Sequence, residues 1–324
     1  IDIPLPNLAP GRNVHAIDLR CSLETQFFKT AVLFSLLRFV NIMNQLHLET
    51  LIVNALTEDI GDGDHSTLAC IDKHVSGKAI LKIKEDTILA GVDIAEKIFK
   101  IADPSVYFKS LKKDGEFVIK GEVAFEVFAP VHTILKCERL VLNTMQRMSG
   151  IASLTKKYTD LLKGYHTRLL DTRKTTPNFR LLEKEAVRIG GGENHRFGLY
   201  DMIMLKDNHI DYCGSIEKAI HLAYEYVQNT KPGLKIEVET RNLEDIKKVM
   251  AIGKVDRIML DNFSIEDIQS ALLLINKKFE TEASGGITLD NIASYASTGV
   301  DFISSGAIIH QAKSVDLSLK AVII

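Results

Sequence analysis

The second half of the chain repeats one pattern, a short apolar strand followed by an amphipathic helix. The last four such strands recur about every 21 to 23 residues, which is the length of one strand–helix unit. Regular alternation of this kind predicts a parallel sheet or a β/α barrel. Six segments have the character of its strands: TRLLD (167–171), MIMLK (202–206), KIEVE (235–239), RIMLD (257–261), FETEAS (279–284) and VDFISS (300–305).

Polar residues stand at the carboxyl end of each of these apolar strands. They are Asp171 and Arg173, Lys206 and Asp207, Glu237 and Glu239, Asp261 and Asn262, Glu282 and Ser284, and Ser304 and Ser305. In a β/α barrel all those ends lie on one face, where active sites are built. A parallel strand is otherwise buried, and burying an uncompensated charge costs several kcal/mol. The sequence therefore predicts a polar site on that face.

The first half of the chain has a different pattern. An amphipathic helix is predicted just after Met43, followed by an acidic loop at 58–70. We interpret this loop as a structural turn, because it lacks the ligand spacing and the closing Glu of a calcium-binding loop. The next segments predict a small α+β unit with a mostly antiparallel sheet, joined to the barrel by a long helical run. They are a strand at 78–86, a helix at 92–102, two strands at 116–129 with a tight turn at Lys120–Gly121, and the helical run at 131–164.

Residues 1–42 differ from the rest and begin with a proline-rich lead. Their apolar run at 27–40 is too short for a membrane span and is interrupted by Lys29 and Arg38. No small-residue cleavage site of a signal peptide follows it. We interpret residues 1–42 as an extension outside the folded core, with Met43 as an alternative start.

Charge and cysteine usage narrow the function classes. The formal net charge is -2, so any anion site must be a local focus of positive charge, and no nucleic-acid partner is indicated. The four cysteines are far apart and show no metal-ligand spacing, which is typical of scattered thiols in a cytoplasmic protein.

Cations are concentrated between Leu169 and His209. Five of them stand beside strand-like or glycine-rich backbone and predict a pocket for a strongly anionic ligand: Arg173, Lys174, His195, Arg196 and Lys206. Three others lie at helical spacing and are predicted to be surface charges with Glu183 and Glu185 as neighbours: Arg180, Lys184 and Arg188.

Two further features complete the predicted site. Glu239 and Asp261 end neighbouring strands and are hard oxygen ligands of the kind that Mg²⁺ prefers. Glycine loops follow the last two strands, Ser284-Gly285-Gly286 and Ser305-Gly306-Ala307, and glycine there lets backbone N–H groups approach a phosphate.

The chain resembles quinolinate phosphoribosyltransferase, also called nicotinate-nucleotide pyrophosphorylase, from about Leu46 to its C-terminus. The most specific motifs are DTRKT, GGGENHR and KDNH, and ERLVLNTMQRMSGIAS, IEVET, IMLDNF, EASGGI and SSGAIIH support them. The resemblance implies an N-terminal α/β sandwich domain at 43–140 and an incomplete, seven-stranded β/α barrel at 141–310. It also implies a C-terminal segment, 311–324, that returns to the N-terminal domain. The seventh strand would lie near 188–196 or inside the long helical run.

The resemblance also implies the site residues and the reaction. Quinolinate's two carboxylates would bind Arg173, His195, Arg196 and Lys206, with Arg139 reaching in from a second subunit of a homodimer; a hexamer is the larger alternative assembly. Phosphoribosyl pyrophosphate would meet Lys174, Glu239, Asp261, Ser284, Gly285, Gly286, Ser305 and Gly306. Catalysis would rest on Lys174, Glu239 and Asp261 with Mg²⁺ as cofactor, and would give nicotinate mononucleotide, pyrophosphate and CO2. Arg241, which follows Thr240, would add a cation close to the metal zone.

Two alternative functions stay open at this point. Lys206 at the end of a barrel strand could form a Schiff base, as in an aldolase. A family relative with an altered substrate could bind a phosphate ligand without catalysing this reaction.

Overall fold

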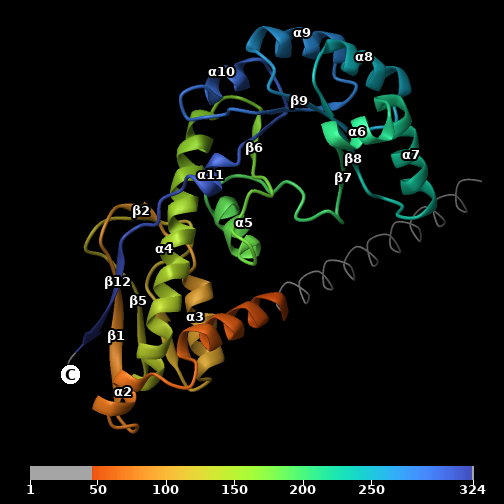
Figure 1. Ribbon diagram of the computed structural model, residues 1–324. Helices are drawn as coiled ribbons and strands as arrows, with labels where there is room; N and C mark the ends of the chain where they lie inside the picture. The colour runs from red at the N-terminus through yellow and green to blue at the C-terminus, as the bar shows by residue number, and fades with distance from the viewer. Residues whose placement is uncertain (1–45, 323–324) are drawn as a thin grey trace, which may run out of the picture. The chain divides into compact units, whose positions relative to one another are not determined.

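The computed structural model describes residues 46–322, and the predictions for residues 1–42 lie outside the described residues (Figure 1). Residues 46–60 are helical, as predicted from the sequence. The N-terminal elements are α2 (His65–Cys70), β1 (Ser76–Ile83), β2 (Thr87–Ile88), α3 (Val92–Ala102), β3 (Tyr107–Ser110), β4 (Phe117–Val118), β5 (Val123–Pro130) and α4 (Val131–Leu161).

The main N-terminal sheet has the order β12-β1-β5-β3 and is antiparallel throughout, as predicted. Its strand β12 (Leu317–Val322) comes from the far end of the chain and pairs with β1. Helix α3 has the predicted bounds and buries an apolar face that includes Ile98 and Phe99. Asp114 accepts a hydrogen bond from the N–H of Val92 at the first turn of α3, 2.8 Å away. The side chain thus satisfies a donor that the helix itself leaves unpaired.

Only part of the acidic segment at 58–70 is the predicted turn: residues 58–60 end the preceding helix, residues 61–64 form the turn, and residues 65–70 are α2. Asp64 caps this helix by accepting the N–H of Thr67.

The strands predicted on either side of Lys120–Gly121 form, with the turn between them, but they do not pair with each other. Gly121 has φ 98°, as the tight turn requires. β4 pairs with β2 in a separate two-stranded sheet, whereas β5 joins the main sheet. The sequence showed the turn correctly, but the partner of each strand depends on segments far from it.

The long helix α4 follows β5 and reaches the elements of the barrel. Gly150 lies where the chain crosses it, and a Cβ there would stand 2.0 Å from the carbonyl oxygen of Lys313. Glycine is therefore required for the C-terminal segment to pass this close to α4 on its way to β12.

The second half of the chain forms a six-stranded parallel sheet with the order β6-β11-β10-β9-β8-β7. All six strands predicted from the sequence are present, and helices follow them in turn (Figure 1). Strand β8 is buried along its whole length, as expected where helices cover a parallel sheet. The strands are β6 (Arg168–Leu170), β7 (Ile203–Leu205), β8 (Ile236–Thr240), β9 (Arg257–Asp261), β10 (Glu280–Ser284) and β11 (Phe302–Ser304). The helices are α5 (Arg180–Ile189), α6 (Asp207–Cys213), α7 (Ile216–Asn229), α8 (Leu243–Ile252), α9 (Ile265–Ile275), α10 (Ile292–Ser297) and α11 (Ala307–His310).

The seventh strand position is occupied by a single residue. Glu193 forms an isolated parallel bridge with Leu170, beside β6 and within one of the two regions where a further strand was expected. The preceding glycines pass close over α4, since a Cβ on Gly190 would stand 2.5 Å from the carbonyl oxygen of Ala152. The described sheet therefore has six strands and one bridge, and not seven full strands.

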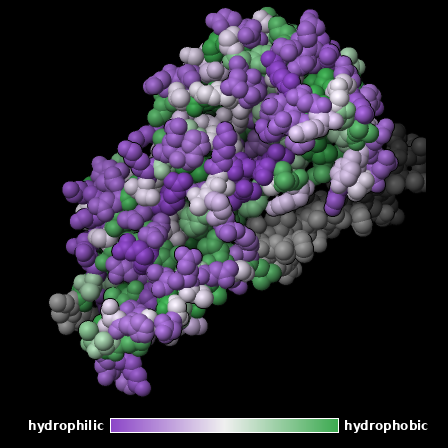
Figure 2. Space-filling model, in the orientation of Figure 1, coloured by the Kyte–Doolittle hydropathy of each residue, from purple (hydrophilic) through white to green (hydrophobic). Residues whose placement is uncertain are grey.

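Hydrophilic residues cover much of the face drawn in Figure 2, with apolar residues interspersed among them. Between residues 46 and 322, no helix combines the length and the apolar character needed to cross a bilayer. The apolar run at 27–40 lies outside that range.

Candidate active site

Two guanidinium groups that repel each other, those of Arg173 and Arg196, lie at the carboxyl ends of the barrel strands. Arg173 follows β6, and its Nε is buried without a hydrogen-bond partner. Arg196 is half-buried and donates to the carbonyl oxygen of Met202 at 3.3 Å. Burial, followed by the positive charge of Arg173, lowers the pKa of Arg196. The charges of Glu237 and Asp201 oppose this shift, and an anion bound beside the two guanidinium groups would oppose it further.

A second group joins Lys206, Glu239 and Asp261 from three neighbouring strands. Lys206 Nζ lies 2.7 Å from Glu239 Oε2, and Glu239 is buried. Burial, followed by the charge of Glu239, raises the pKa of Asp261, while Lys206 and Lys174 oppose that shift. Lys174 therefore belongs to the same electrostatic neighbourhood, as the sequence predicted.

The two glycine loops lie beside these residues. Gly285 has φ 97°, and a Cβ there would stand 2.2 Å from Asn262 Oδ1, so only glycine fits against the end of β9. A Cβ on Gly306 would stand 2.9 Å from Cδ of Lys174 and 3.1 Å from Cδ2 of His310. Gly306 thus brings the β11 loop against Lys174 at the start of α11.

His310 is a neighbour of this loop that the sequence analysis missed. It is exposed at the end of α11, four residues after Gly306. Its presence within SSGAIIH was the only signal, because a histidine in a short helix has no distinctive pattern.

His195 is buried in the barrel interior, and its Nε2 makes no hydrogen bond within residues 46–322 although two carboxylates lie near it. Its Nδ1 accepts the N–H of Arg196 at 2.7 Å, which places the ring proton on Nε2. Nε2 lies 3.0 Å from Glu237 Oε2 and 3.2 Å from Glu282 Oε2. Arg257 Nη1 donates to the same Glu282 oxygen at 2.9 Å. Burial, followed by the charge of Glu282, raises the pKa of Glu237.

The side chains of His195, Glu237 and Glu282 have ligand atoms within 4.8 Å of one another, a spacing that could hold a metal ion. A metal would need the lone pair of Nε2, yet that nitrogen carries the ring proton. Arg257 already supplies a positive charge to Glu282. We therefore assign the cluster to a charge network in the barrel interior beneath Arg196.

The prediction that Lys184 is a surface charge was wrong, and its neighbour Glu183 is also buried. Lys184 forms an ion pair with Asp171, and Glu183 forms one with Arg147. The prediction for Arg188 is confirmed, since it is exposed and pairs with Glu185 at 2.8 Å.

Arg180 is half-buried, and so only partly a surface charge. It donates to Thr175 Oγ1 and to the carbonyl oxygen of Phe197.

Arg139 and Arg241 stand apart from this constellation. Arg139 is exposed on α4 and makes no hydrogen bond or ion pair within residues 46–322. Arg241 is directed to Asp211 of α6, with Nη2 2.8 Å from Oδ1. Its charge is therefore already paired near the predicted metal zone.

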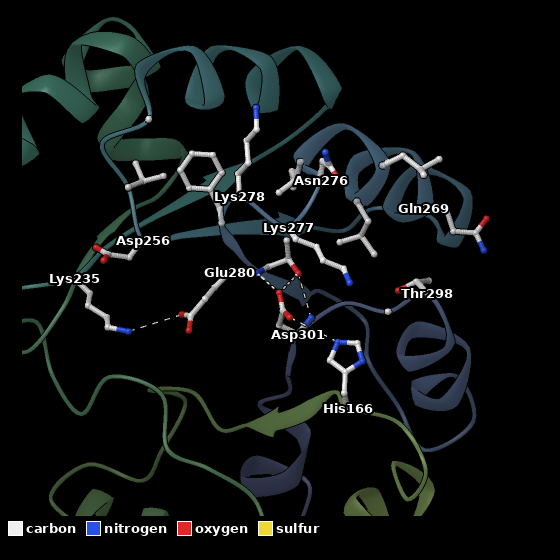
Figure 3. Close-up of a pocket in the computed structure, with 18 residues that line it drawn as sticks. His166, Lys235, Asp256, Gln269, Asn276, Lys277, Lys278, Glu280, Thr298 and Asp301 are labelled. Atoms are coloured by element: carbon white, nitrogen blue, oxygen red, sulfur yellow. Dashed lines mark hydrogen bonds and ion pairs between the residues drawn. The ribbon is translucent and has the colours of Figure 1, made fainter.

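Figure 3 shows a groove of about 1330 Å³ at the opposite, amino ends of the barrel strands. Several of its charged side chains are paired with one another. Asp301 accepts the N–H and the hydroxyl of Thr281 at 2.9 and 2.7 Å, and His166 lies 3.7 Å from Asp301. Lys235 lies 3.9 Å from Glu280. These paired groups support the amino end of the barrel. Lys277 and Lys278 also line the groove and form no ion pair within residues 46–322.

Comparison with known protein families agrees with this geometry. The family profile "Quinolinate phosphoribosyl transferase, C-terminal domain" matches residues 151–320, and the N-terminal domain profile of the same family matches residues 64–149. The chain belongs to the quinolinate phosphoribosyltransferase family. The resemblance carried by DTRKT, GGGENHR and KDNH is thereby confirmed.

Individual members of the quinolinate phosphoribosyltransferase family are similar over most of their length. The chloroplastic nicotinate-nucleotide pyrophosphorylase (carboxylating) of Oryza sativa is 43% identical over 84% of this chain and 77% of its own length. The probable nicotinate-nucleotide pyrophosphorylase (carboxylating) of Bacillus subtilis is 42% identical over 86% of this chain and 94% of its own. The crystal structure of NadC from Streptococcus pyogenes superposes with a TM-score of 0.80 at 41% identity, covering 86% of this chain and 98% of that one.

Proposed function

We propose that this protein transfers the phosphoribosyl group of phosphoribosyl pyrophosphate to quinolinate. The products would be nicotinate mononucleotide, pyrophosphate and CO2, in the de novo biosynthesis of NAD. The observation that carries the proposal is the orphaned, buried Nε of Arg173 beside the half-buried Arg196. A planar dicarboxylate would place negative charge beside this pair, in the geometry that guanidinium groups prefer.

The site residues divide the work between the two substrates. Arg173, Arg196 and Lys206 would bind the carboxylates and orient the pyridine nitrogen toward C1 of the ribose. Lys174, lying against Gly306, would neutralise the departing pyrophosphate. Glu239 or Asp261 would stabilise the positive charge that develops on the ribose. The quaternised ring nitrogen can then accept the electrons released on loss of the 2-carboxylate, so no protein nucleophile is required.

His195 has a modified role in this proposal. Because its Nδ1 accepts the N–H of Arg196, its ring supports the backbone of the residue that binds the carboxylate. Any contact between His195 and quinolinate would use Nε2, which lies 3.0 Å from Glu237 Oε2 and 3.2 Å from Glu282 Oε2.

We further propose Mg²⁺ as cofactor, held by Glu239 and Asp261. The oxygen donors suit Mg²⁺, since the raised pKa of Asp261 reflects burial and repulsion by Glu239. A cation would relieve this repulsion further than the charges of Lys206 and Lys174 already do. When bound, Mg²⁺ would neutralise charge on the pyrophosphate group. Activity should be lost with a chelator and recovered with added Mg²⁺; full activity in chelator would contradict this cofactor.

The proposal includes a homodimer in the cytoplasm, with Arg139 of each subunit completing the site of the other. Its support is that Arg139 is exposed and has no partner within the described residues. Relatives from plants are named as chloroplastic or mitochondrial, so localisation needs its own test by fluorescent tagging.

Two rival functions are less well supported. A Schiff-base lysine needs a free amine to attack a carbonyl, whereas Lys206 Nζ is held 2.7 Å from a carboxylate oxygen of Glu239. A ligand-binding relative without activity would need the same anion site but would release no pyrophosphate.

The deciding experiment measures pyrophosphate release from phosphoribosyl pyrophosphate with quinolinate, and separately with nicotinate. Nicotinate lacks the 2-carboxylate and would leave part of the cationic group unpaired, a situation that sites reject strongly. Pyrophosphate release is expected when quinolinate is the second substrate and not when nicotinate is. Equal turnover of nicotinate, or no release with either, would overturn the proposal.

A further inference from the structure

Helix α5 carries two consecutive charged residues that are both buried. Glu183 is 0% exposed and Lys184 is 2% exposed. Consecutive residues on a helix point in different directions, so each reaches its own set of partners. Neither residue belongs to the set assigned to the substrates above.

Glu183 connects Arg147 of α4 to the loop that carries Lys174. Arg147 Nε and Nη2 lie 2.9 and 2.8 Å from Glu183 Oε1. On the other side, Glu183 accepts the N–H of Thr176 at 2.8 Å and its hydroxyl at 2.9 Å. Thr176 is two residues after Lys174, so this carboxylate anchors the loop just beyond that lysine.

Arg147 also holds the element that follows the Ser305-Gly306 loop. Its Nη1 donates to the carbonyl oxygen of Ala312 at 2.7 Å, and its Nη2 donates to that of Ile309 at 2.9 Å. Ile309 lies in α11, which begins directly after Gly306, and Ala312 lies two residues beyond its end. The Arg147–Glu183 pair therefore fixes both parts of the surface where Lys174 meets Gly306.

Lys184 supports a different segment. Its Nζ donates to Asp171 and to the carbonyl oxygen of His195, the latter at 3.0 Å. Asp171 in turn accepts the N–H of His195 at 2.9 Å and the amide of Asn194 at 2.7 Å. The Asp171–Lys184 pair therefore fixes residues 194–196, which include Arg196.

We propose that Glu183 and Lys184 are positioning residues for different substrates. Glu183, with Arg147, positions the site of phosphoribosyl pyrophosphate, and Lys184, with Asp171, positions the site of the pyridine dicarboxylate. This assignment rests on the proposed function.

Arg180, on the same helix, contacts both of the segments that Glu183 and Lys184 hold separately. Arg180 joins Thr175 to Phe197 but bonds to neither Glu183 nor Lys184. Its loss should therefore disturb both sites together, whereas the loss of Glu183 or Lys184 should disturb one.

The test compares four variants of α5 by measuring KM for each substrate. In Glu183→Gln, KM for phosphoribosyl pyrophosphate should rise on the order of tenfold while KM for quinolinate stays within about twofold. A misplacement of about 1 Å can cost about a hundredfold, and the retained amide oxygen should limit the displacement to less than that. In Lys184→Met the pattern should reverse. Arg180→Met should raise both values, and Arg188→Met, which removes an exposed cation, should change neither. Parallel changes in both values in the Glu183 and Lys184 variants would overturn the proposal.

Two further variants and one measurement guard against misfolding or a wrong function. Arg147→Met breaks the Arg147–Glu183 pair from its other partner and is compared with Glu183→Gln. Asp171→Asn breaks the Asp171–Lys184 pair in the same way and is compared with Lys184→Met. Amide hydrogen exchange is measured without substrate. It should accelerate at Thr176 only in the Glu183→Gln and Arg147→Met variants, and at His195 only in the Lys184→Met and Asp171→Asn variants. Acceleration at both amides in every variant would refute separate supports. If the exchange pattern holds but quinolinate is not turned over, the proposed function fails and the two separate supports stand.

Discussion

The substitution Lys184→Met distinguishes a buried ion pair from a surface charge. Lys184 and Asp171 are 2% and 0% exposed, and the amine also donates to the carbonyl oxygen of His195. Methionine has a similar length but no charge. The variant therefore leaves the carboxylate of Asp171 in the protein interior without its cation.

The loss of the cation sets how much the free energy of unfolding should fall in Lys184→Met. Asp171 would keep its bonds from Asn194 and from the N–H of His195, but these do not neutralise it. Breaking a buried pair by removing one partner costs about 3–5 kcal/mol, whereas an exposed pair is worth about 0–1 kcal/mol. The double variant Asp171→Asn/Lys184→Met removes both charges and should cost less than Lys184→Met alone.

Urea unfolding followed by circular dichroism measures these differences. Arg188→Met is the matched control, because Arg188 lies on the same helix and is exposed beside Glu185. Its effect should be within about 0.5 kcal/mol. If Lys184→Met destabilised the protein no more than this control, Lys184 would be solvated and the buried pair would be refuted.

Three other predictions test the site and the core. Mixed subunits carrying Arg139→Ala or Lys174→Ala, each nearly inactive alone, should recover about a quarter of the activity after verified exchange, since half of the dimers are hybrids with one intact site; no recovery would place Arg139 within its own chain or outside the site. Gly306→Ala should weaken binding of phosphoribosyl pyrophosphate in calorimetry, because its Cβ would displace Lys174, while the melting temperature should move by only about 2 °C. Burial raises the pKa of the Asp114 carboxyl from 3.8 to about 6, so the folded state binds the carboxyl proton more tightly than the unfolded state does. The stability that this difference contributes is fully present below pH 3.8 and is lost as the pH rises through about 6. Asp114→Asn, which keeps the bond to Val92, should therefore gain stability relative to the parent between these pH values in thermal melts, and equal pH profiles would contradict the assignment.

Local patterns of polarity predicted much of the fold. The amphipathic spacing of α3 predicted its bounds, and the apolar segments of the second half predicted all six described strands of the barrel. The polar strand ends also predicted which residues meet, because the carboxyl ends of parallel strands converge whatever the rest of the chain does. Lys206, Glu239 and Asp261 are neighbours for this reason.

The sequence could not show which charged residues are buried or what their partners are. Lys184 and Arg188 share a helix and have carboxylates nearby, so spacing alone gave them the same surface assignment. Only the packing of α5 shows that Lys184 meets Asp171, 13 residues away, while Glu183 meets Arg147, 36 residues away. In the same way, β4 pairs with β2 instead of with β5, and Glu193 supplies one bridge where a strand was expected. Periodicity records how polarity alternates along the chain, whereas the partner of a buried charge is chosen by contacts between segments distant in sequence.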